Sequence, residues 1–215
     1  MQNSAPFSID NYLERLRNSR ASTEAPHRRP LPLPHISEAI RDNYREIVER
    51  SREAWIQDEK ISEAIDKASR WLQDQQAPCF LILSGPPGTG KTTLLHAIHS
   101  ALKEREARSI PDFFTALQIA RFAESETSKY YAICEDLSFV AIDDIGTESA
   151  RLNMYGTERA PIKNLLEERY TRRLRTIITT NLGPREIRER YGDRIADRFK
   201  EAAIVPFTGE SYRGR

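Results

Sequence analysis

Short apolar runs alternate with longer amphipathic stretches over most of this 215-residue chain. Continuous apolar or β-branched runs of strand length predict strands at Phe80–Leu83, Ser109–Phe114, Ser138–Ile142, Thr176–Thr180 and Ala203–Phe207. The stretches between them have helical spacing and predict helices at 94–102, 115–122, 126–136, 160–173 and 185–199, the last broken near Gly192. Such alternation is typical of an α/β fold with a parallel sheet and helices on both faces. Ligands of such folds bind at the carboxyl ends of the strands.

Two further amphipathic helices are expected before the first strand, at Ser37–Trp55 and Ile61–Leu72. Their apolar residues, among them Ile40, Tyr44 and Trp71, are expected to pack against the sheet. An alternative is that the junction between the two helices lines a pocket for an adenine base, since a base must stack on something apolar.

Residues 1–34 differ in character from the rest of the chain. Ser8–Asn18 predicts a short helix with an apolar stripe of Ile9, Tyr12, Leu13 and Leu16. The proline-rich stretch Ala25–His35 predicts an extended linker. An isolated helix of this length is marginal in water, so it must dock on the body, on another copy or on a partner. We therefore expect a docking element and linker at 1–34 and one domain at 35–215.

Composition narrows the class of protein. The chain is 39% hydrophobic and 30% charged, and no apolar run approaches the ~20 residues of a membrane span. We expect a cytoplasmic protein with no membrane contact. Cys79 and Cys134 are expected to be buried thiols, because no metal-type cysteine spacing is present. Basic residues exceed acidic ones in 150–215, an excess that suits nucleic acid, the phosphates of a nucleotide on a neighbouring subunit, or solvent alone.

A phosphate-binding loop follows the first predicted strand. Gly85, Gly90, Lys91 and Thr92 have the spacing Gly-x-x-x-x-Gly-Lys-(Ser or Thr). Glycines let successive backbone N–H groups turn toward an anion, and the next helix adds the positive end of its dipole. Lys91 is expected to reach the β- and γ-phosphates, and the Thr92 hydroxyl to bind Mg²⁺. The expected nucleotide-binding residues are Gly85, Pro86, Pro87, Gly88, Thr89, Gly90, Lys91, Thr92 and Thr93. The alternative is a glycine-rich turn between a strand and a helix.

Polar residues end two further predicted strands. Asp143 and Asp144 follow an apolar strand, so Asp143 is expected to hold Mg²⁺ and Asp144 to polarise the attacking water. Asn181 ends the strand at 176–180, where its amide can orient water or detect the γ-phosphate. The alternatives are a carboxylate cap on the strand and a turn-forming Asn before Gly183.

Two arginines lie four residues apart in the last predicted helical region. Arg194 and Arg198 therefore share one face of the helix. With Asp193 and Asp197 beside them, a solvated face of salt bridges is the alternative to a functional role.

Taken in order, these motifs resemble those of AAA+ P-loop ATPases of the DnaC/DnaI helicase-loader group and the related IstB-like ATP-binding family. The likeness covers residues 61–215 and rests on the loop at 85–93, Ile-Asp-Asp-Ile-Gly, Leu-Leu-Glu-Glu-Arg-Tyr, Thr-Thr-Asn-Leu, Tyr-Gly-Asp-Arg-Ile-Ala-Asp-Arg and a closing Ser-Tyr-Arg. It implies ATP with Mg²⁺, a homo-oligomer with the nucleotide at a subunit boundary, single-stranded DNA, and a replicative DNA helicase as partner.

The resemblance also implies roles for individual residues. Lys91 and Thr92 match Walker A, and Asp143 and Asp144 match Walker B. The remaining matches are Asn181 to sensor 1, Arg198 to the arginine finger, and Arg213 to a sensor 2-like arginine.

Three departures from the pattern leave the function open. Asp144 stands where many AAA+ proteins have Glu, so slow hydrolysis is expected. No cysteine cluster precedes the core, and the segment at 147–157 is longer than in the familiar loaders. The alternatives are an IstB-like transposition helper acting on duplex DNA, a small-molecule kinase, and a nucleotide-gated binding module with little turnover. For single-stranded DNA the candidates are Phe122 and Tyr155 beside Arg121 and Lys163, unless the aromatic rings are core residues.

Overall fold

The computed structural model describes residues 33–51, 58–105, 107, 110–135, 139–154 and 157–208. The predicted helix at Ser8–Asn18, most of the proline-rich linker, Trp55, Tyr155 and Arg213 lie outside these ranges.

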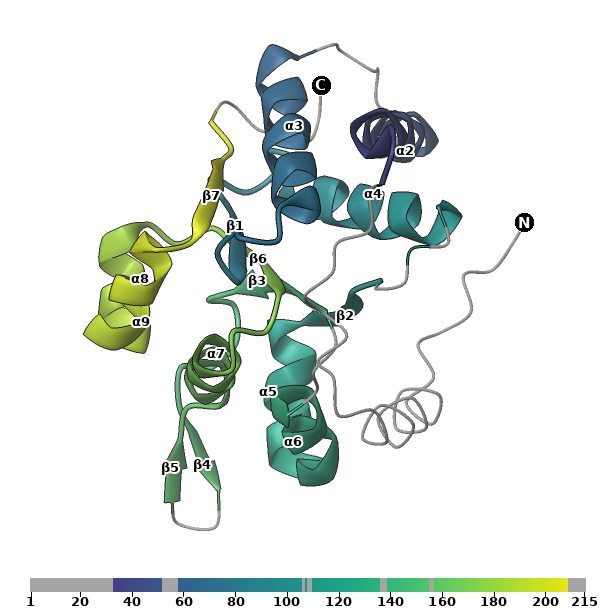
Figure 1. Cartoon of the computed structure of the whole chain (residues 1–215). Helices are drawn as coiled ribbons and strands as arrows, with labels where there is room; N and C mark the ends of the chain where they lie inside the picture. Colours follow the sequence, from purple (N-terminus) through teal and green to yellow (C-terminus); the bar gives the residue numbers. More distant parts are fainter. Residues whose placement is uncertain are drawn as a thin grey trace.

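A parallel five-stranded sheet forms the centre of the domain (Figure 1). Its strands are β1 (Phe80–Ser84), β2 (Asp112–Thr115), β3 (Val140–Ile145), β6 (Thr176–Thr180) and β7 (Ala203–Pro206). Their order is β2-β3-β6-β1-β7, and every paired neighbour runs parallel. The predicted α/β fold is confirmed, with all five strands close to their expected places.

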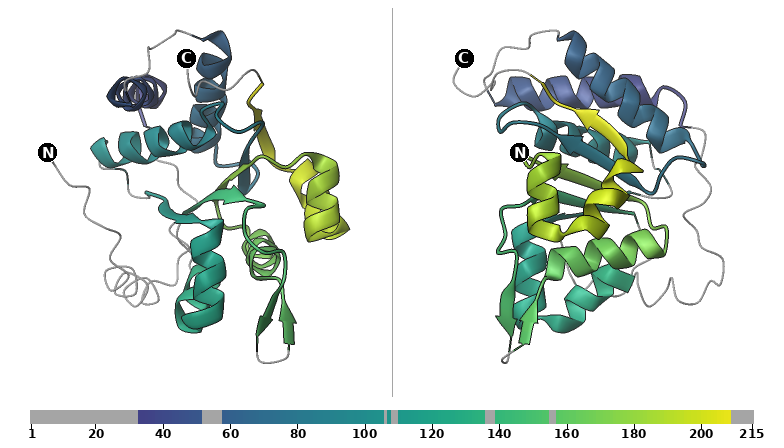
Figure 2. Two further views of the ribbon diagram at one scale, coloured as in Figure 1. Left: turned by 180° about the vertical axis from the view of Figure 1, so that it is seen from behind. Right: turned by 90° about the vertical axis from the view of Figure 1, so that its left-hand side faces the viewer.

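Helices cover both faces of this sheet, as Figure 2 shows. One face carries α2 (Ile36–Arg50), α3 (Glu59–Gln73) and α4 (Lys91–Glu104). The other carries α5 (Ala116–Ser125), α6 (Thr127–Glu135), α7 (Pro161–Thr171), α8 (Pro184–Tyr191) and α9 (Asp193–Lys200). Successive strand residues alternate between the faces, so Leu81 and Leu83 join the first layer while Phe80 and Ile82 join the second. Two buried faces explain why the strands are continuous apolar runs.

Local sequence sets the helix boundaries. The Thr115 hydroxyl accepts a hydrogen bond from the Gln118 N–H at 3.1 Å, and the Gln118 side chain accepts one from the Thr115 N–H at 2.8 Å. This capping box confirms Thr115 as the predicted cap. Pro161 and Pro184 occupy the first positions of α7 and α8, where no intrahelical N–H is needed. Gly192, with φ 87°, separates α8 from α9 at the predicted break.

Of the two leading helices, α3 packs against β7 of the sheet, as predicted, whereas α2 packs mainly on α4 and α3. Ile40 and Tyr44 of α2 are buried, and the Asn43 amide donates to the Glu104 carboxylate of α4 at 2.8 Å. The adenine-pocket alternative depended on the junction between these helices, of which residues 52–57 lie outside the described ranges.

The segment after β3 contains a hairpin that the hydrophobic pattern does not predict. Strands β4 (Leu152–Met154) and β5 (Thr157–Arg159) pair antiparallel and extend away from the central sheet (Figure 1). Three residues are too few for an alternating pattern to be visible in the sequence. Its strands lie at the end of the segment at 147–157 and just beyond it.

Two arginines of the basic C-terminal part make contacts within the domain. The Arg175 guanidinium lies 3.9 Å from the centre of the Trp71 ring, and burial lowers its pKa to about 10. Arg172 pairs with Glu168 at 2.5 Å.

Cys79 and Cys134 are both buried, as predicted. Within the described residues, no helix combines the length and the apolar character needed to cross a membrane.

The buried side chain of Arg169, in α7, links three elements of the structure. Its side chain is completely buried and donates to the Thr176 hydroxyl at 2.9 Å. It also donates to the carbonyls of Ile133 and Arg175, each at 3.1 Å. These bonds connect α7 with the end of α6 and with the start of β6.

We predict that Arg169→Met lowers the free energy of unfolding by about 3 kcal/mol, because the carbonyls of Ile133 and Arg175 and the buried Thr176 hydroxyl lose a hydrogen-bond donor. Urea denaturation of both proteins measures this difference. The control is Arg172→Met, at the exposed C-cap of the same helix, which should cost less than about 1 kcal/mol. Equal losses for the two variants would contradict the structural role of Arg169.

Candidate functional site

The strand order places three polar strand ends side by side. Because β6 lies between β1 and β3, Asn181 after β6 stands between the loop after β1 and the acidic pair of β3. Parallel strands present their carboxyl ends at one edge, so all three groups face the same edge of the sheet. The sequence motifs are thereby brought together.

Backbone shape in the loop depends on two of its glycines. Gly85 has φ 150°, and a Cβ there would lie 2.1 Å from the Phe207 carbonyl oxygen. Gly90 has φ 96°, and its Cβ would lie 2.1 Å from the Tyr44 hydroxyl. Only glycine fits either place, which explains both glycines of the motif. The second contact also brings α2 directly against the loop.

Lys91 closes the inside of the loop. Its side chain is buried, and its Nζ donates to the carbonyl oxygens of Gly85 and Pro86, each at 2.7 Å. The Thr89 hydroxyl donates to the same Pro86 carbonyl at 2.8 Å. Lys91 is also the first residue of α4, and the first N–H groups of a helix have no intrahelical acceptor. The loop therefore combines an ammonium group with a helix N-terminus, the chemistry that binds phosphate.

The predicted metal ligands lie next to each other. The Thr92 hydroxyl is 3.1 and 3.3 Å from the two carboxylate oxygens of Asp143. Asp143 also accepts a hydrogen bond from the Thr179 hydroxyl at 2.6 Å, which fixes its orientation. A hydroxyl and a carboxylate at the phosphate end of the loop are oxygen ligands of the kind that Mg²⁺ prefers. These residues fit the ion that the motif implies.

Asp144 is held in an uncommon backbone conformation. Its φ is 59°, and the pairing of β3 with β6 shifts register between Ile142 and Ile145. The Asp144 N–H donates to the Thr179 hydroxyl at 2.8 Å, and the Asn181 amide donates to its carboxylate at 3.3 Å. Asp143 and Asp144 thus share Thr179 but have different neighbours, as expected for two different roles. A left-handed, non-glycine residue at a strand end is a strain often found at functional sites.

Sequence reasoning missed Glu148, which lies in the turn just after the acidic pair. Its carboxylate is buried and accepts hydrogen bonds from the Gly146 N–H at 2.8 Å and the Tyr191 hydroxyl at 2.6 Å. Burial, together with this carboxylate, raises the pKa of the Tyr191 phenol. A single Glu in a polar turn gives no periodic signal, so only the fold reveals its burial.

Arg198 contacts its own chain. The guanidinium lies 4.6 Å from the centre of the Tyr170 ring and donates to the Glu167 carbonyl at 3.4 Å. Arg173 lies over the same ring at 4.9 Å, and the Tyr170 hydroxyl is 2.5 Å from the Glu201 carboxylate. That hydrogen bond is the main cause of the raised pKa of Tyr170. Within the described part of the chain, the contacts recorded for Arg198 are with α7 and not with the loop or the acidic pair.

Arg194, which was predicted to share a helix face with Arg198, is exposed. Among the described residues, none forms an ion pair or a side-chain hydrogen bond with the Arg194 guanidinium. The salt-bridge alternative is therefore realised elsewhere on these helices, where Asp193 pairs with Arg188 and Asp197 with Lys200.

The aromatic candidate for DNA that the structure describes faces inward. Phe122 is partly buried and packs edge-on against Phe114, with ring centres 6.3 Å apart. This agrees with the alternative that Phe122 belongs to the core. Arg121 is exposed and Lys163 is half-buried.

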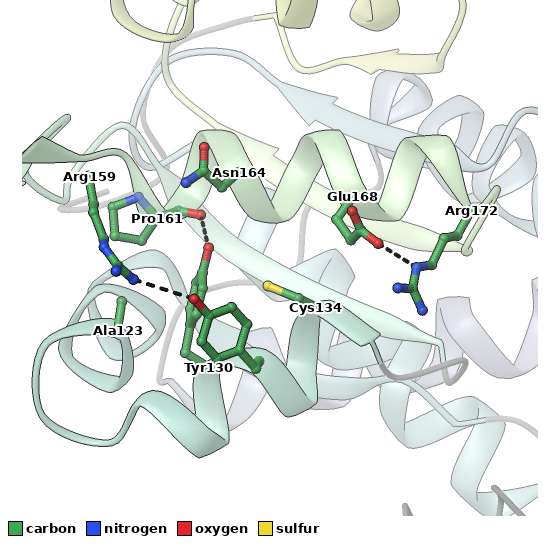
Figure 3. Close-up of a pocket in the computed structure, with 9 residues that line it drawn as sticks. Ala123, Tyr130, Cys134, Arg159, Pro161, Asn164, Glu168 and Arg172 are labelled. Atoms are coloured by element: carbon green, nitrogen blue, oxygen red, sulfur yellow. Dashed lines mark hydrogen bonds and ion pairs between the residues drawn. The ribbon is translucent and has the colours of Figure 1, made fainter.

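A separate cavity of about 280 Å³ lies between α6 and α7 (Figure 3). Tyr130 on its wall donates to the Pro161 carbonyl at 2.8 Å, and Arg159 donates to the Tyr131 hydroxyl at 3.4 Å. None of the predicted site residues lines this cavity. The predicted site residues therefore lie apart from this cavity, at the carboxyl edge of the sheet.

Comparison with solved structures supports the fold. The structure titled "Crystal structure of the DnaC helicase loader" has a TM-score of 0.57 and 20% identity, covering 72% of this chain and 94% of that one. "Crystal Structure of the DnaI" has a TM-score of 0.55 and 20% identity, with 72% and 88% covered. "Replication initiator DnaA bound to AMPPCP and single-stranded DNA" has 0.53 and 19%, with 73% and 49% covered. At this identity the likeness shows the fold, which is that of the DnaC/DnaI-like AAA+ group.

Sequence comparison adds the family. No curated protein matches the chain at a significant level. The family model described as "Nephrocystin 3, N-terminal" matches residues 55–172, more than half of the chain, including the phosphate loop and the acidic pair of β3. The chain therefore belongs to the Nephrocystin 3, N-terminal family and has the P-loop fold of the DnaC/DnaI-like AAA+ proteins.

Proposed function

We propose that this protein binds ATP with Mg²⁺ and hydrolyses it slowly, as an AAA+ ATPase. The observation that carries the proposal is the contact of Thr92 with Asp143 beside the Lys91 ammonium group. A phosphate-binding loop and a metal-binding pair at one sheet edge serve phosphoryl transfer, which depends on positioning and on charge stabilisation.

Phosphate binding is assigned to the loop and the start of α4. Lys91 would exchange its carbonyl contacts with Gly85 and Pro86 for phosphate oxygens, since an ammonium–phosphate bond is charge-assisted. Thr92 and Asp143 would hold Mg²⁺, which supplies neutralising charge at the β- and γ-phosphate oxygens. Thr179 keeps the Asp143 carboxylate turned toward Thr92.

Water activation is assigned to Asp144 and Asn181. Asp144 would accept a proton from the attacking water, while the Asn181 amide orients its carboxylate through the 3.3 Å hydrogen bond. Asp is one methylene shorter than Glu, so the carboxylate reaches less far from the strand. This is the reason for expecting slow turnover.

Arg198 is assigned to the site of the neighbouring subunit in a homo-oligomer. An arginine supplied across an interface stabilises charge on the transferring phosphoryl group. To reach that position, Arg198 would leave the face of Tyr170, and breaking this half-buried cation–π contact would cost about 1–2 kcal/mol. Arg213, outside the described residues, remains a candidate for a second nucleotide-contacting arginine.

The finer proposal is that this ATPase loads or remodels a replicative DNA helicase on single-stranded DNA. It is supported by the order of the motifs and by the fold shared with the structures titled as helicase loader and initiator. The alternatives are an IstB-like helper on duplex DNA and a nucleotide-gated module with little turnover. Measuring ATP turnover without DNA, with single strands and with duplex distinguishes the three, because each predicts a different stimulation.

We predict that Lys91→Ala weakens ATP binding at least about tenfold, because a charge-assisted phosphate contact contributes about 1.5–3 kcal/mol. Calorimetric titration of the folded variant measures the affinity. The control is Lys103→Ala, an exposed lysine on the same helix, which should bind ATP as the unmodified protein does. Unchanged affinity in Lys91→Ala would remove the phosphate-loop assignment.

We predict that Arg198→Ala and Asp144→Asn each bind ATP but lose turnover, for Arg198 by about 10³-fold. Mixing the two proteins should restore part of the activity, because some interfaces then combine an intact Arg198 with an intact Asp144. The measurement is the rate of phosphate release after the two proteins are mixed. Two fluorescent labels, one on each variant, show separately that subunits exchange. If exchange occurs and no activity returns, Arg198 does not serve its neighbour.

We predict that deleting residues 1–32 leaves ATP affinity within about twofold and abolishes capture of the replicative helicase in a pull-down. The deletion ends at 32 because Leu33 packs on the core and its carbonyl accepts from the Ile36 N–H at 3.2 Å. Helicase capture by the shortened protein would show that the docking surface lies within the domain.

A further inference from the structure

The turn that follows the acidic pair is fixed on the side facing Asn181. The Thr147 N–H and hydroxyl both donate to the Asp144 carbonyl, at 3.3 and 2.8 Å. Gly146 has φ 106°, and a Cβ on it would lie 2.7 Å from the Leu182 side chain. The backbone of this turn is therefore packed against the residue next to Asn181, and a shift of Asp144 would move the turn with it.

Glu148 fixes the same turn on its other side. Its carboxylate is 1% exposed and lies 3.5 Å from the Arg190 guanidinium of α8. One carboxylate oxygen accepts from Gly146 in the turn, and the other accepts from Tyr191 at the end of α8. The Arg190 guanidinium also donates to the Glu148 carbonyl. A buried carboxylate with this many partners has one low-energy position, because leaving any partner unpaired is costly.

The far end of this connection carries Arg198. Tyr191 ends α8, Gly192 turns the chain, and α9 follows directly with Arg198 in its last turn. Ile187, Tyr191 and Ile195 are buried in one cluster, so α8 and α9 pack into the same core. Glu148 thus contacts the turn of one catalytic candidate and the helix pair that carries another.

We propose that Glu148 is a positioning residue that couples the Asp144 turn to the α8–α9 pair. Nucleotide bound near Asp144 and Asn181 would shift the turn, and Glu148 would pass the shift to α8 and so to Arg198. The proposal rests on the function proposed above. It adds that the nucleotide bound in one subunit determines the position of the Arg198 that this subunit presents to its neighbour. Such a coupling links the Asp144 turn energetically to the α8–α9 pair, because Glu148 contacts both.

Hydrogen exchange of the full chain with and without ATP tests this coupling. We expect ATP to change the exchange of backbone amides in residues 184–200 of the unmodified protein. Glu148→Gln should bind ATP within about twofold of normal, lose that change in exchange, and turn ATP over about tenfold more slowly. The neutral amide removes the charge facing Arg190 and presents a donor where one of the two bonds needs an acceptor.

Two matched variants complete the experiment. Glu189→Gln removes an exposed ion pair with Arg185 within α8 and should behave as the unmodified protein does. Tyr191→Phe keeps the buried ring but deletes the hydroxyl donor, so it should reduce the ATP-dependent change, and it provides the result if Glu148→Gln does not fold.

The possible results separate this proposal from the function beneath it. If the unmodified protein binds ATP but shows no change at 184–200, or if the change survives in Glu148→Gln and Tyr191→Phe, Glu148 is a structural residue only. If the unmodified protein does not bind ATP, the titration shows this directly and the ATPase proposal itself fails.

Discussion

One hydroxyl group holds the two acidic residues of the site in their different positions. The Thr179 hydroxyl donates to the Asp143 carboxylate at 2.6 Å and accepts from the Asp144 N–H at 2.8 Å. This is possible only because β6 lies directly beside β3 in the sheet. The register shift in β3 then turns Asp144 toward Asn181, while Asp143 stays beside Thr92. The proposed division between metal binding by Asp143 and water activation by Asp144 therefore depends on the strand order.

The interior of the domain shows how charged groups are made compatible with burial. Arg169 is satisfied by a hydroxyl and two carbonyls, Arg175 by carbonyls and an aromatic face, and Glu148 by a phenol, an amide and a guanidinium. Each group connects elements that are far apart in the sequence. Burying a charge is costly unless it is fully hydrogen-bonded, so these contacts fix relative positions more firmly than apolar packing alone.

The strands and the loop chemistry could be predicted because both depend on local sequence. A strand buried on both faces must be a continuous apolar run, and a phosphate loop must have glycines at positions such as 85 and 90. The partners of Glu148 and Arg198 could not be predicted, because they lie on α8 and α7, many residues away. The hairpin at 152–159 was missed because its strands are three residues long.

The contact between Tyr44 and Gly90 bears on where the domain can be divided. A hydroxyl from α2 occupies the space that a side chain at position 90 would need, so α2 forms part of the wall of the loop. The smallest fragment that keeps the loop in this shape therefore begins before α2 and not at β1. In a chimaeric protein, a loop transplanted with β1 and α4 alone would lose this support and gain a solvent-filled gap beside Gly90.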